Sequence, residues 1–270
     1  GIKKIGHTGT LDPDATGVLP VCIGKATKVC DLLTDKDKTY EAVMRLGVVT
    51  DTQDMTGQVL EEHAVTVTED AVRRAVGQFV GQIEQVPPMY SALKVGGQKL
   101  CNLARKGIEV ERKPRPVTIY EIRIKNIALP LVTMEVHCSK GTYIRTLCQD
   151  IGQALGCGGC MESLVRTQVA SFALADSLTL AQIEEAKKED RLDQILLPID
   201  QVFSAYPKVY ASEEADKRLV NGNEQMQARA DEAIDEGDPV RIYLSDGRFV
   251  GIYHLNEHQF KLKKMFLETT

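Results

Sequence analysis

The sequence predicts an α+β fold, in which a mixed sheet with flanking helices is followed by a small β-rich module. Three observations lead to this prediction. Apolar residues alternate along segments such as 38–49, and they recur at helical spacing in segments such as 68–83. The sequence pattern changes around 198–207. With 270 residues, 43% of them hydrophobic, the chain can bury one large core and one small one.

Strands are predicted where apolar side chains occupy every second position. In "KTYEAVMRLGVV", residues 38–49, one face of the strand carries Tyr40, Ala42, Met44, Leu46 and Val48. The segments "VTIYEIRIKNIAL" and "LVTMEVHCS", residues 117–129 and 131–139, predict two further strands, and a Ser-Lys-Gly turn ends the second one.

Three helices are predicted from apolar residues at 3.6-residue spacing. The first covers residues 68–83, with Thr68 as its N-cap, the second covers 144–155, and the third covers 179–196. Between the first helix and the next strand, residues 85–116 form a long excursion that is rich in Pro, Gly and basic residues.

Beyond residue 205 the predicted elements are shorter. A strand and a helix are expected in 206–222, a β-hairpin around Ser245-Asp246-Gly247, and a last strand in 260–268. We therefore expect a larger domain at 1–205 and a small β-rich domain at 206–270.

The net charge of −5 hides an asymmetry along the chain. Between Lys94 and Lys125, nine Lys or Arg against three acids give +6, and between Asp176 and Asp238, sixteen acids against seven bases give −9. Such a basic stretch permits a face that binds a polyanion, and a solvated charged surface explains it equally well.

Composition also disfavours several classes of protein. No apolar run approaches the roughly 20 residues of a membrane-spanning helix, and no signal-peptide pattern opens the chain. Seven irregularly spaced cysteines predict reduced thiols in a cytoplasmic protein. The pair Cys157 and Cys160 lacks two further ligands at suitable spacing, so no metal site is predicted. Because the chain begins at Gly1, almost inside its first motif, we expect that an N-terminal piece is missing.

The stretch "GHTGTLDPDATGVLP", residues 6–20, surrounds the acid Asp12 with glycines and prolines. Pro13 pushes the backbone of Asp12 into an extended conformation, and the glycines let the loop turn. The loop therefore holds a carboxylate on a stiff segment, although a plain Asp-Pro turn is the alternative. A phosphate-binding loop is excluded because no Lys follows Gly17. A carboxylate pair with Asp14, as a glycosidase needs, would tend to diverge.

Two further side chains are hard to explain as structural. Arg145 lies in the first turn of a predicted helix, off its apolar stripe, where the helix dipole disfavours a cation. We expect it to pair with an anion from another segment, and an ordinary surface arginine is the alternative. Tyr40 faces the apolar side of its strand without an evident partner for its hydroxyl, and core packing is the alternative there.

Five motifs, in this order, closely resemble those of the bacterial TruB-type tRNA pseudouridine synthases. They are "GHTGTLDPDATGVLPVCIGKATK", "KTYEAVMRLG", "MYSALKVGGQKLCNLARKGIEV", "CSKGTYIRTLCQDIG" and "SLVRT". The resemblance covers nearly the whole chain. It implies an enzyme without cofactor or metal that isomerises uridine 55 in the T loop of tRNA to pseudouridine. It also implies a mixed, mainly antiparallel sheet in 1–205, a thumb-like insertion at 85–115 that grips the T arm, and a PUA-type RNA-binding domain at 206–270.

The resemblance assigns catalytic roles to three residues of this chain. Asp12 matches the catalytic carboxylate, and Arg145 matches the arginine that pairs with it. Tyr40 matches the tyrosine that is expected to stack on the uracil and to help in removing the C5 proton.

The resemblance also implies residues that bind the substrate. His7 matches the histidine that fills the space left by the flipped base, and Tyr143 and Leu164 match residues that line the base pocket. The RNA contacts expected in the insertion are Lys94, Lys99 and Arg105. The implied partner is the T arm of tRNA, with no membrane and no obligatory protein partner.

Three features depart from the family pattern. The Lys-Pro-x-Gly-x-(Ser/Thr)-Ser segment that normally opens the family's chains is not present. Val165 stands where the first of two consecutive basic residues normally follows Leu164, so that Arg166 remains alone and one basic contact is expected to be lost. Cys160 stands where the family often has a histidine, and no role is predicted for its thiol.

Three other interpretations remain open at this point. An RNA-binding protein without catalysis would need no set such as Asp12, Tyr40 and Arg145. A glycoside hydrolase using Asp12 and Asp14 would release free uracil, whereas an isomerase leaves the RNA strand intact. A guide-dependent relative would act on ribosomal RNA in a ribonucleoprotein, and the long basic insertion fits the stand-alone bacterial form better.

Overall fold

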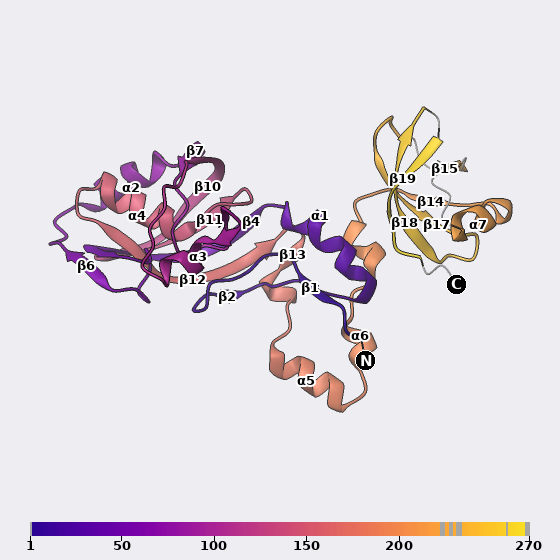
Figure 1. Cartoon of the computed structure of the whole chain (residues 1–270), viewed down its shortest axis with the longest axis horizontal. Coiled ribbons are helices and arrows are strands. Elements are labelled where there is room, and N and C mark those ends of the chain that lie inside the picture. The colour runs from indigo at the N-terminus through magenta and orange to yellow at the C-terminus, as the bar shows by residue number, and fades with distance from the viewer. Residues whose placement is uncertain (1, 222–224, 227–228, 231–233, 258, 268–270) are drawn as a thin grey trace. The chain divides into compact units, whose positions relative to one another are not determined.

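The computed structural model describes residues 2–221, 225–226, 229–230, 234–257 and 259–267. The chain forms two compact units (Figure 1). The larger unit consists of Gly9–Pro20 and Leu33–Ser177. The other unit consists of the residues up to Thr8, Val21–Leu32 and the chain from Leu178 on.

The larger unit is built on a seven-stranded sheet. Its strands are β2 (Thr16–Gly17), β4 (Lys38–Leu46), β7 (Gly81–Gln85), β10 (Arg115–Ala128), β11 (Leu131–Cys138), β12 (Gly159–Val169) and β13 (Phe172–Ala173). The strand order is β13-β12-β4-β11-β10-β7, and β2 pairs with β12 off this path. The pairing of β2 with β12 is parallel and the other pairings are antiparallel. This mixed, mainly antiparallel sheet with helices packed against it confirms the predicted fold class.

Two helices pack on this sheet and against each other, α2 (Glu69–Gly77) and α4 (Ile144–Ala154). Thr68 caps α2 as predicted, because its hydroxyl accepts a hydrogen bond from the Ala71 N–H at 3.3 Å. The core between sheet and helices is filled by alternating strand residues and by the apolar stripes of both helices, including Met44, Met134, Leu147 and Ile151.

Two of the predicted helices differ from the observed ones. The helix predicted at 68–83 ends at Gly77, because residues 81–85 pair with β10 instead and Gly81 adopts a φ of +111° that a helix does not allow. The helix predicted at 179–196 is two helices, α5 (Leu180–Lys188) and α6 (Leu192–Ile195), since the backbone at Asp190 turns to a φ of +54°.

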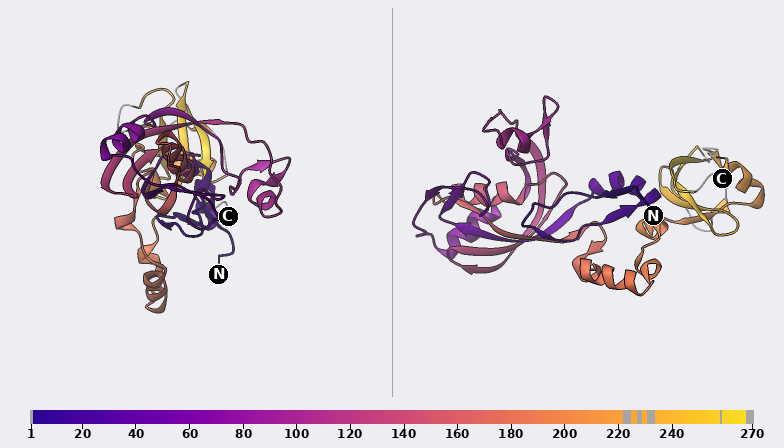
Figure 2. Two further views of the ribbon diagram at one scale, coloured as in Figure 1. Left: turned by 90° about the vertical axis from the view of Figure 1, so that its left-hand side faces the viewer. Right: turned by 60° about the horizontal axis from the view of Figure 1, so that its bottom comes forward.

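The excursion between β7 and β10 contains a small hairpin and a short helix. They are β8 (Lys94–Val95), β9 (Gln98–Lys99) and α3 (Leu100–Ala104). Figure 2 shows this insertion standing away from the sheet. A second hairpin of the larger unit joins β5 (Val48–Thr50) to β6 (Val59–Glu62), and a short helical turn, η2 (Leu174–Asp176), follows β13.

The other unit contains a six-stranded sheet with its own core. Its strands are β14 (Lys208–Tyr210), β15 (Gln225–Met226), β16 (Arg229–Ala230), β17 (Pro239–Tyr243), β18 (Phe249–Asn256) and β19 (Gln259–Met265), and α7 (Glu213–Val220) packs on them. β17 and β18 form the predicted hairpin. The last predicted strand corresponds to β19, and its predicted end at 268 lies outside the described residues.

Near its beginning the chain forms a second, smaller group of elements. They are β1 (Ile5–His7), β3 (Val21–Ile23), η1 (Gly24–Val29) and α1 (Cys30–Thr34), and η3 (Ile199–Phe203) precedes the C-terminal sheet. Among the described residues, no helix combines the length and the apolar character that a membrane span requires.

Candidate active site

A cavity of about 120 Å³ lies in the larger unit, where the loop after Gly9 meets β4, β12 and the N-terminus of α4. Five residues that the sequence singles out line it, namely Asp12, Tyr40, Tyr143, Arg145 and Leu164, together with Thr10, Leu11, Thr142 and Ile144. The first, second and fourth resembling motifs, which are far apart in the sequence, therefore meet at one place with the last one.

The loop that carries Asp12 contains a tight turn and is held in place against β12. The Ala15 N–H donates to the Asp12 carbonyl at 3.0 Å, so that Pro13 occupies the second position of a four-residue turn, where its fixed φ fits. Gly17 has a φ of +114°, and a Cβ there would lie 2.2 Å from the Arg166 carbonyl oxygen. The loop therefore lies so close to β12 that only glycine fits at this position.

Arg145 and Asp12 form a bidentate ion pair. The Nε of Arg145 lies 2.8 Å from Asp12 Oδ2, and its Nη2 donates to Asp12 Oδ1 at 3.1 Å. The arginine side chain is 5% exposed, whereas that of Asp12 is 38% exposed and borders the cavity. The anion expected from another segment is thus present, and the paired carboxylate compensates a cation placed unfavourably at a helix N-terminus.

The remaining N–H groups of Arg145 are also directed at oxygen atoms. Nη1 donates to the Thr52 carbonyl at 3.0 Å and lies 3.6 Å from Asp54 Oδ2, and Nη2 donates to the Tyr90 carbonyl at 2.9 Å. Partners from three segments therefore fix the plane of the guanidinium group and with it the orientation of the Asp12 carboxylate.

Asp54 is a buried member of this network that the sequence reasoning missed. Its Oδ1 accepts hydrogen bonds from the Thr52 hydroxyl at 2.7 Å and from the N–H and hydroxyl of Thr56 at 3.0 and 2.6 Å. Its Oδ2 is left to face Arg145. The only signal in the sequence is a stretch dense in Asp and Thr, "TDTQDMTG", which is typical of any side-chain-stabilised turn.

Tyr40 reaches the cavity from β4 and is 9% exposed. Burial raises the pKa of its hydroxyl to about 12, and the guanidinium of Arg166 beside it opposes that shift only in part. The phenol is therefore neutral at pH 7, and Arg166 is the partner that the sequence did not reveal.

Arg166 is a structural cation rather than a surface contact. It is 1% exposed, its Nε donates to the Val18 carbonyl at 2.7 Å and its Nη2 to the Gly9 carbonyl at 3.2 Å. The side chain thus joins both ends of the loop that carries Asp12 and lies beside Tyr40. The basic residue that remains after Leu164 is therefore buried and holds the loop that carries Asp12.

The three predicted base-binding residues occupy different elements. Tyr143 precedes α4 as its N-cap residue, and burial raises the pKa of its hydroxyl. Leu164 lies on β12 and is 8% exposed. His7 ends β1 in the other unit, opposite Val21, and is not among the residues that line the cavity.

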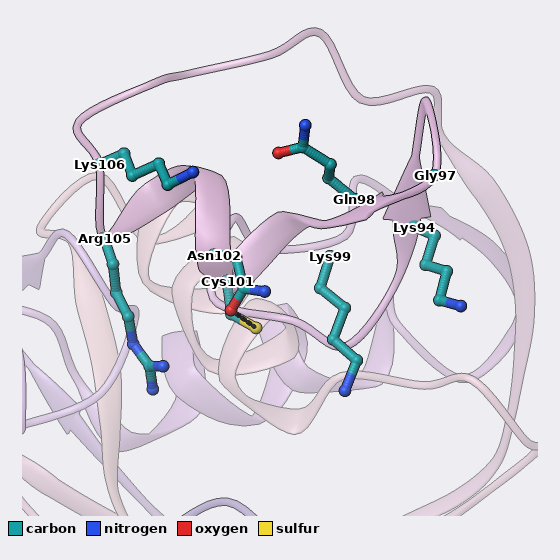
Figure 3. Close-up of a pocket in the computed structure, with 8 residues that line it drawn as sticks. All are labelled: Lys94, Gly97, Gln98, Lys99, Cys101, Asn102, Arg105 and Lys106. Atoms are coloured by element: carbon teal, nitrogen blue, oxygen red, sulfur yellow. Dashed lines mark hydrogen bonds between the residues drawn. The ribbon is translucent and has the colours of Figure 1, made fainter.

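The insertion carries an open depression of about 720 Å³ with a basic lining (Figure 3). Lys94 and Lys99 face each other across β8 and β9, and Arg105 follows α3. Figure 3 shows the Lys99 and Arg105 side chains extending to the same side. All three are exposed, and within the described residues none of them pairs with a carboxylate. Arg112 differs, because it donates to the Pro87 carbonyl and to Glu109, both at 3.1 Å.

The cysteines form no evident metal or disulfide site. All seven are free thiols, and in the described part of the chain no three His, Cys, Asp or Glu side chains gather as metal ligands. Cys157 and Cys160 are both buried, and the Cys160 sulfur lies 3.5 Å from the Met55 sulfur. Burial raises the pKa of Cys160 to about 11, so this thiol is packed and protonated at neutral pH.

Similar solved structures share this fold. A Cbf5 chain in a Cbf5-Nop10-Gar1 complex superposes with a TM-score of 0.72 and is 28% identical, covering 99% of this chain and 78% of its own. A chain of an H/ACA RNP bound to a substrate RNA containing 2'-deoxyuridine also gives 0.72, at 25% identity with the same coverage.

Family models and curated relatives identify the family of this chain. The model of the TruB family pseudouridylate synthase N-terminal domain matches residues 1–144, and that of the tRNA pseudouridylate synthase B C-terminal domain matches residues 145–204. The tRNA pseudouridine synthase B of Lachnoclostridium phytofermentans is 54% identical over 281 residues, which cover 98% of this chain and 91% of that protein. The same enzyme of Clostridium novyi is 46% identical over 267 residues, covering 99% and 91%. The chain belongs to the TruB family of pseudouridylate synthases.

Proposed function

We propose that this pseudouridine synthase isomerises uridine 55 in the T loop of tRNA and that Asp12 is its catalytic carboxylate. The observation that carries the proposal is the bidentate pair of Asp12 with the buried Arg145 at the wall of the cavity. The relatives named tRNA pseudouridine synthase B support tRNA as the substrate.

The reaction suits a site built on one carboxylate. The bond from ribose C1′ to N1 of the uracil breaks, and a bond from C1′ to C5 forms. The C5 proton leaves to water and N1 takes up a proton, so the reaction involves neither net hydrolysis nor a change of oxidation state. Asp12 acts as nucleophile or base in this rearrangement, and Arg145 orients the carboxylate and compensates its charge.

The other cavity residues bind the base. Because the Tyr40 phenol is neutral at pH 7, its first role is to stack on the uracil, and it takes up the C5 proton only if the substrate changes its surroundings. Tyr143 and Leu164 enclose the base on the other sides. The target base is stacked in the folded T arm, so it must be flipped out to reach Asp12, and His7 is the residue that takes its place.

The exposed basic side chains of the insertion are proposed to bind the T arm. Lys94, Lys99 and Arg105 contact phosphates, and the β-rich domain at 206–270 adds a PUA-like RNA-binding surface. We place the domain boundary near residue 205, assign the enzyme to the cytoplasm, where its free thiols stay reduced, and expect no obligatory protein partner.

The test is tritium release from tRNA that carries C5-labelled uridine. The wild-type chain should release tritium and leave the RNA strand intact, and Asp12→Asn should release none while tRNA still binds. A variant that loses binding or folding as severely as turnover would make Asp12 a structural turn residue.

The same assay separates the two rival functions. A binding protein releases no tritium, and a glycosidase would produce free uracil. The structure disfavours the glycosidase, because Asp14 is exposed and is not among the residues that line the cavity with Asp12.

A further inference from the structure

Gln85 is a buried amide that the proposed chemistry does not use. It is the last residue of β7 and is 1% exposed. Its Nε2 donates to the Tyr143 carbonyl at 3.2 Å, and its Oε1 accepts from the Tyr143 N–H at 3.0 Å. One side chain thus satisfies both main-chain polar groups of a single residue 58 positions away.

That residue is where α4 begins. Tyr143 is the N-cap residue of α4, and its own side chain makes no capping hydrogen bond. In a capping box, a Glu or Gln three residues into the helix bonds back to the N-cap N–H, but Thr146 occupies that position in α4. Gln85 supplies this bond from another element, so β7 fixes the point from which the first turn of α4 starts.

The catalytic arginine lies in that first turn. Arg145 is two residues beyond Tyr143, and a rotation of the turn would move its guanidinium relative to Asp12. The segment that follows Gln85 also bonds Arg145 directly, because the Tyr90 carbonyl accepts a hydrogen bond from Arg145 Nη2 at 2.9 Å. The residues at the start of the insertion therefore bond both the main chain at the N-terminus of α4 and the Arg145 side chain that orients Asp12.

We propose that Gln85 is a positioning residue, which sets the placement of Arg145 and thereby of the Asp12 carboxylate. The inference rests on the proposed function. Gln85 is not expected to touch the RNA, because its amide is buried and both of its ends are occupied by Tyr143. Its loss should therefore lower kcat at saturating tRNA, since displacing a reacting group by about 1 Å costs on the order of a hundredfold in rate.

The experiment measures tritium release and tRNA affinity for Gln85→Met, which keeps the length of the side chain and removes both hydrogen bonds. We expect kcat to fall at least tenfold, with KM and the salt dependence of tRNA binding unchanged. Gln82→Met is the matched control, because it is the same substitution on an exposed position of the same strand, and it should keep the wild-type kcat.

Gln85→Glu keeps the test decisive if the methionine variant unfolds. When ionised, its carboxylate accepts from the Tyr143 N–H but cannot donate to the Tyr143 carbonyl and repels it, so a folded protein with reduced kcat at pH 8 is expected. A wild-type kcat in either folded variant, or a loss confined to KM, would overturn the proposal. Inactive wild-type protein would instead refute the proposed function, so the two failures are distinguishable.

Discussion

At the scale of single residues, partners decide which buried charges are stable. Arg145 is almost fully buried, yet carboxylates and carbonyl groups surround it, and such complete compensation is what offsets the desolvation of a buried ion. Asp150 lies on the same helix and is half-buried, and burial alone raises its pKa to about 6. Within the described residues, α4 thus carries one charge that is paired and one that is not.

This contrast predicts a pH-dependent effect of Asp150→Asn. Because the pKa of Asp150 is higher in the folded than in the unfolded chain, its contribution to stability is present below the unfolded value and is lost as pH rises through 6. The variant should therefore be more stable than wild type at pH 8, by roughly 1 kcal/mol after allowing for partial exposure, or about 2–4 °C in Tm. Thermal unfolding at pH 5 and pH 8 checks this, and an equal gain at both values would contradict it.

At the scale of elements, the insertion is a hairpin that places charge away from the sheet. Gly96 and Gly97, with φ of +55° and +83°, form the tight turn between β8 and β9 and bring Lys94 opposite Lys99. Two like charges directly opposite each other destabilise a hairpin, and no acid within the described residues compensates them. Such an arrangement is easier to understand if phosphates supply the missing charge.

Lys99→Ala should therefore weaken tRNA binding and reduce its salt dependence. One lost phosphate contact lowers the slope of log K against log salt by somewhat under one unit, because fewer counterions are released. The kcat at saturating tRNA should change little. Arg73→Ala on α2 is the control, since its guanidinium already lies 3.7 Å from Glu69 and should not contact RNA. If the slope of log K against log salt is unchanged in Lys99→Ala, the basic side chains of the insertion only keep the segment soluble.

At the scale of the whole molecule, the described residues form two hydrophobic cores. One lies between the seven-stranded sheet and its helices and includes Leu147, and the other lies in the C-terminal sheet and includes Leu219. Separate cores are the condition under which unfolding departs from a single two-state transition.

Calorimetry should accordingly show two transitions that respond to different substitutions. Leu219→Ala removes a side chain that is 1% exposed and should lower one transition, at a cost of about 2–5 kcal/mol. Leu147→Ala, at a position that is 0% exposed, should lower the other. If each substitution shifted both transitions equally, the chain would unfold as one cooperative unit.

The sequence by itself determined the local features of this protein. Alternation predicted β4, β10 and β11, and the turn Ser245-Asp246-Gly247 between two apolar runs predicted the C-terminal hairpin. The Asp-Pro turn and the misplaced charge of Arg145 pointed to Asp12 and Arg145, since both depend on residue type and near neighbours alone.

Only the tertiary structure decided the features that depend on distant segments. The pairing of β7 with β10 overrode the helical period of residues 78–83, and the bulged strand β12 lacked a regular alternation to reveal it. Asp54, Arg166 and Gln85 look ordinary in the sequence. Their roles come from the segments opposite them, because a buried hydrogen bond or ion pair is defined by both partners and the sequence lists only one at a time.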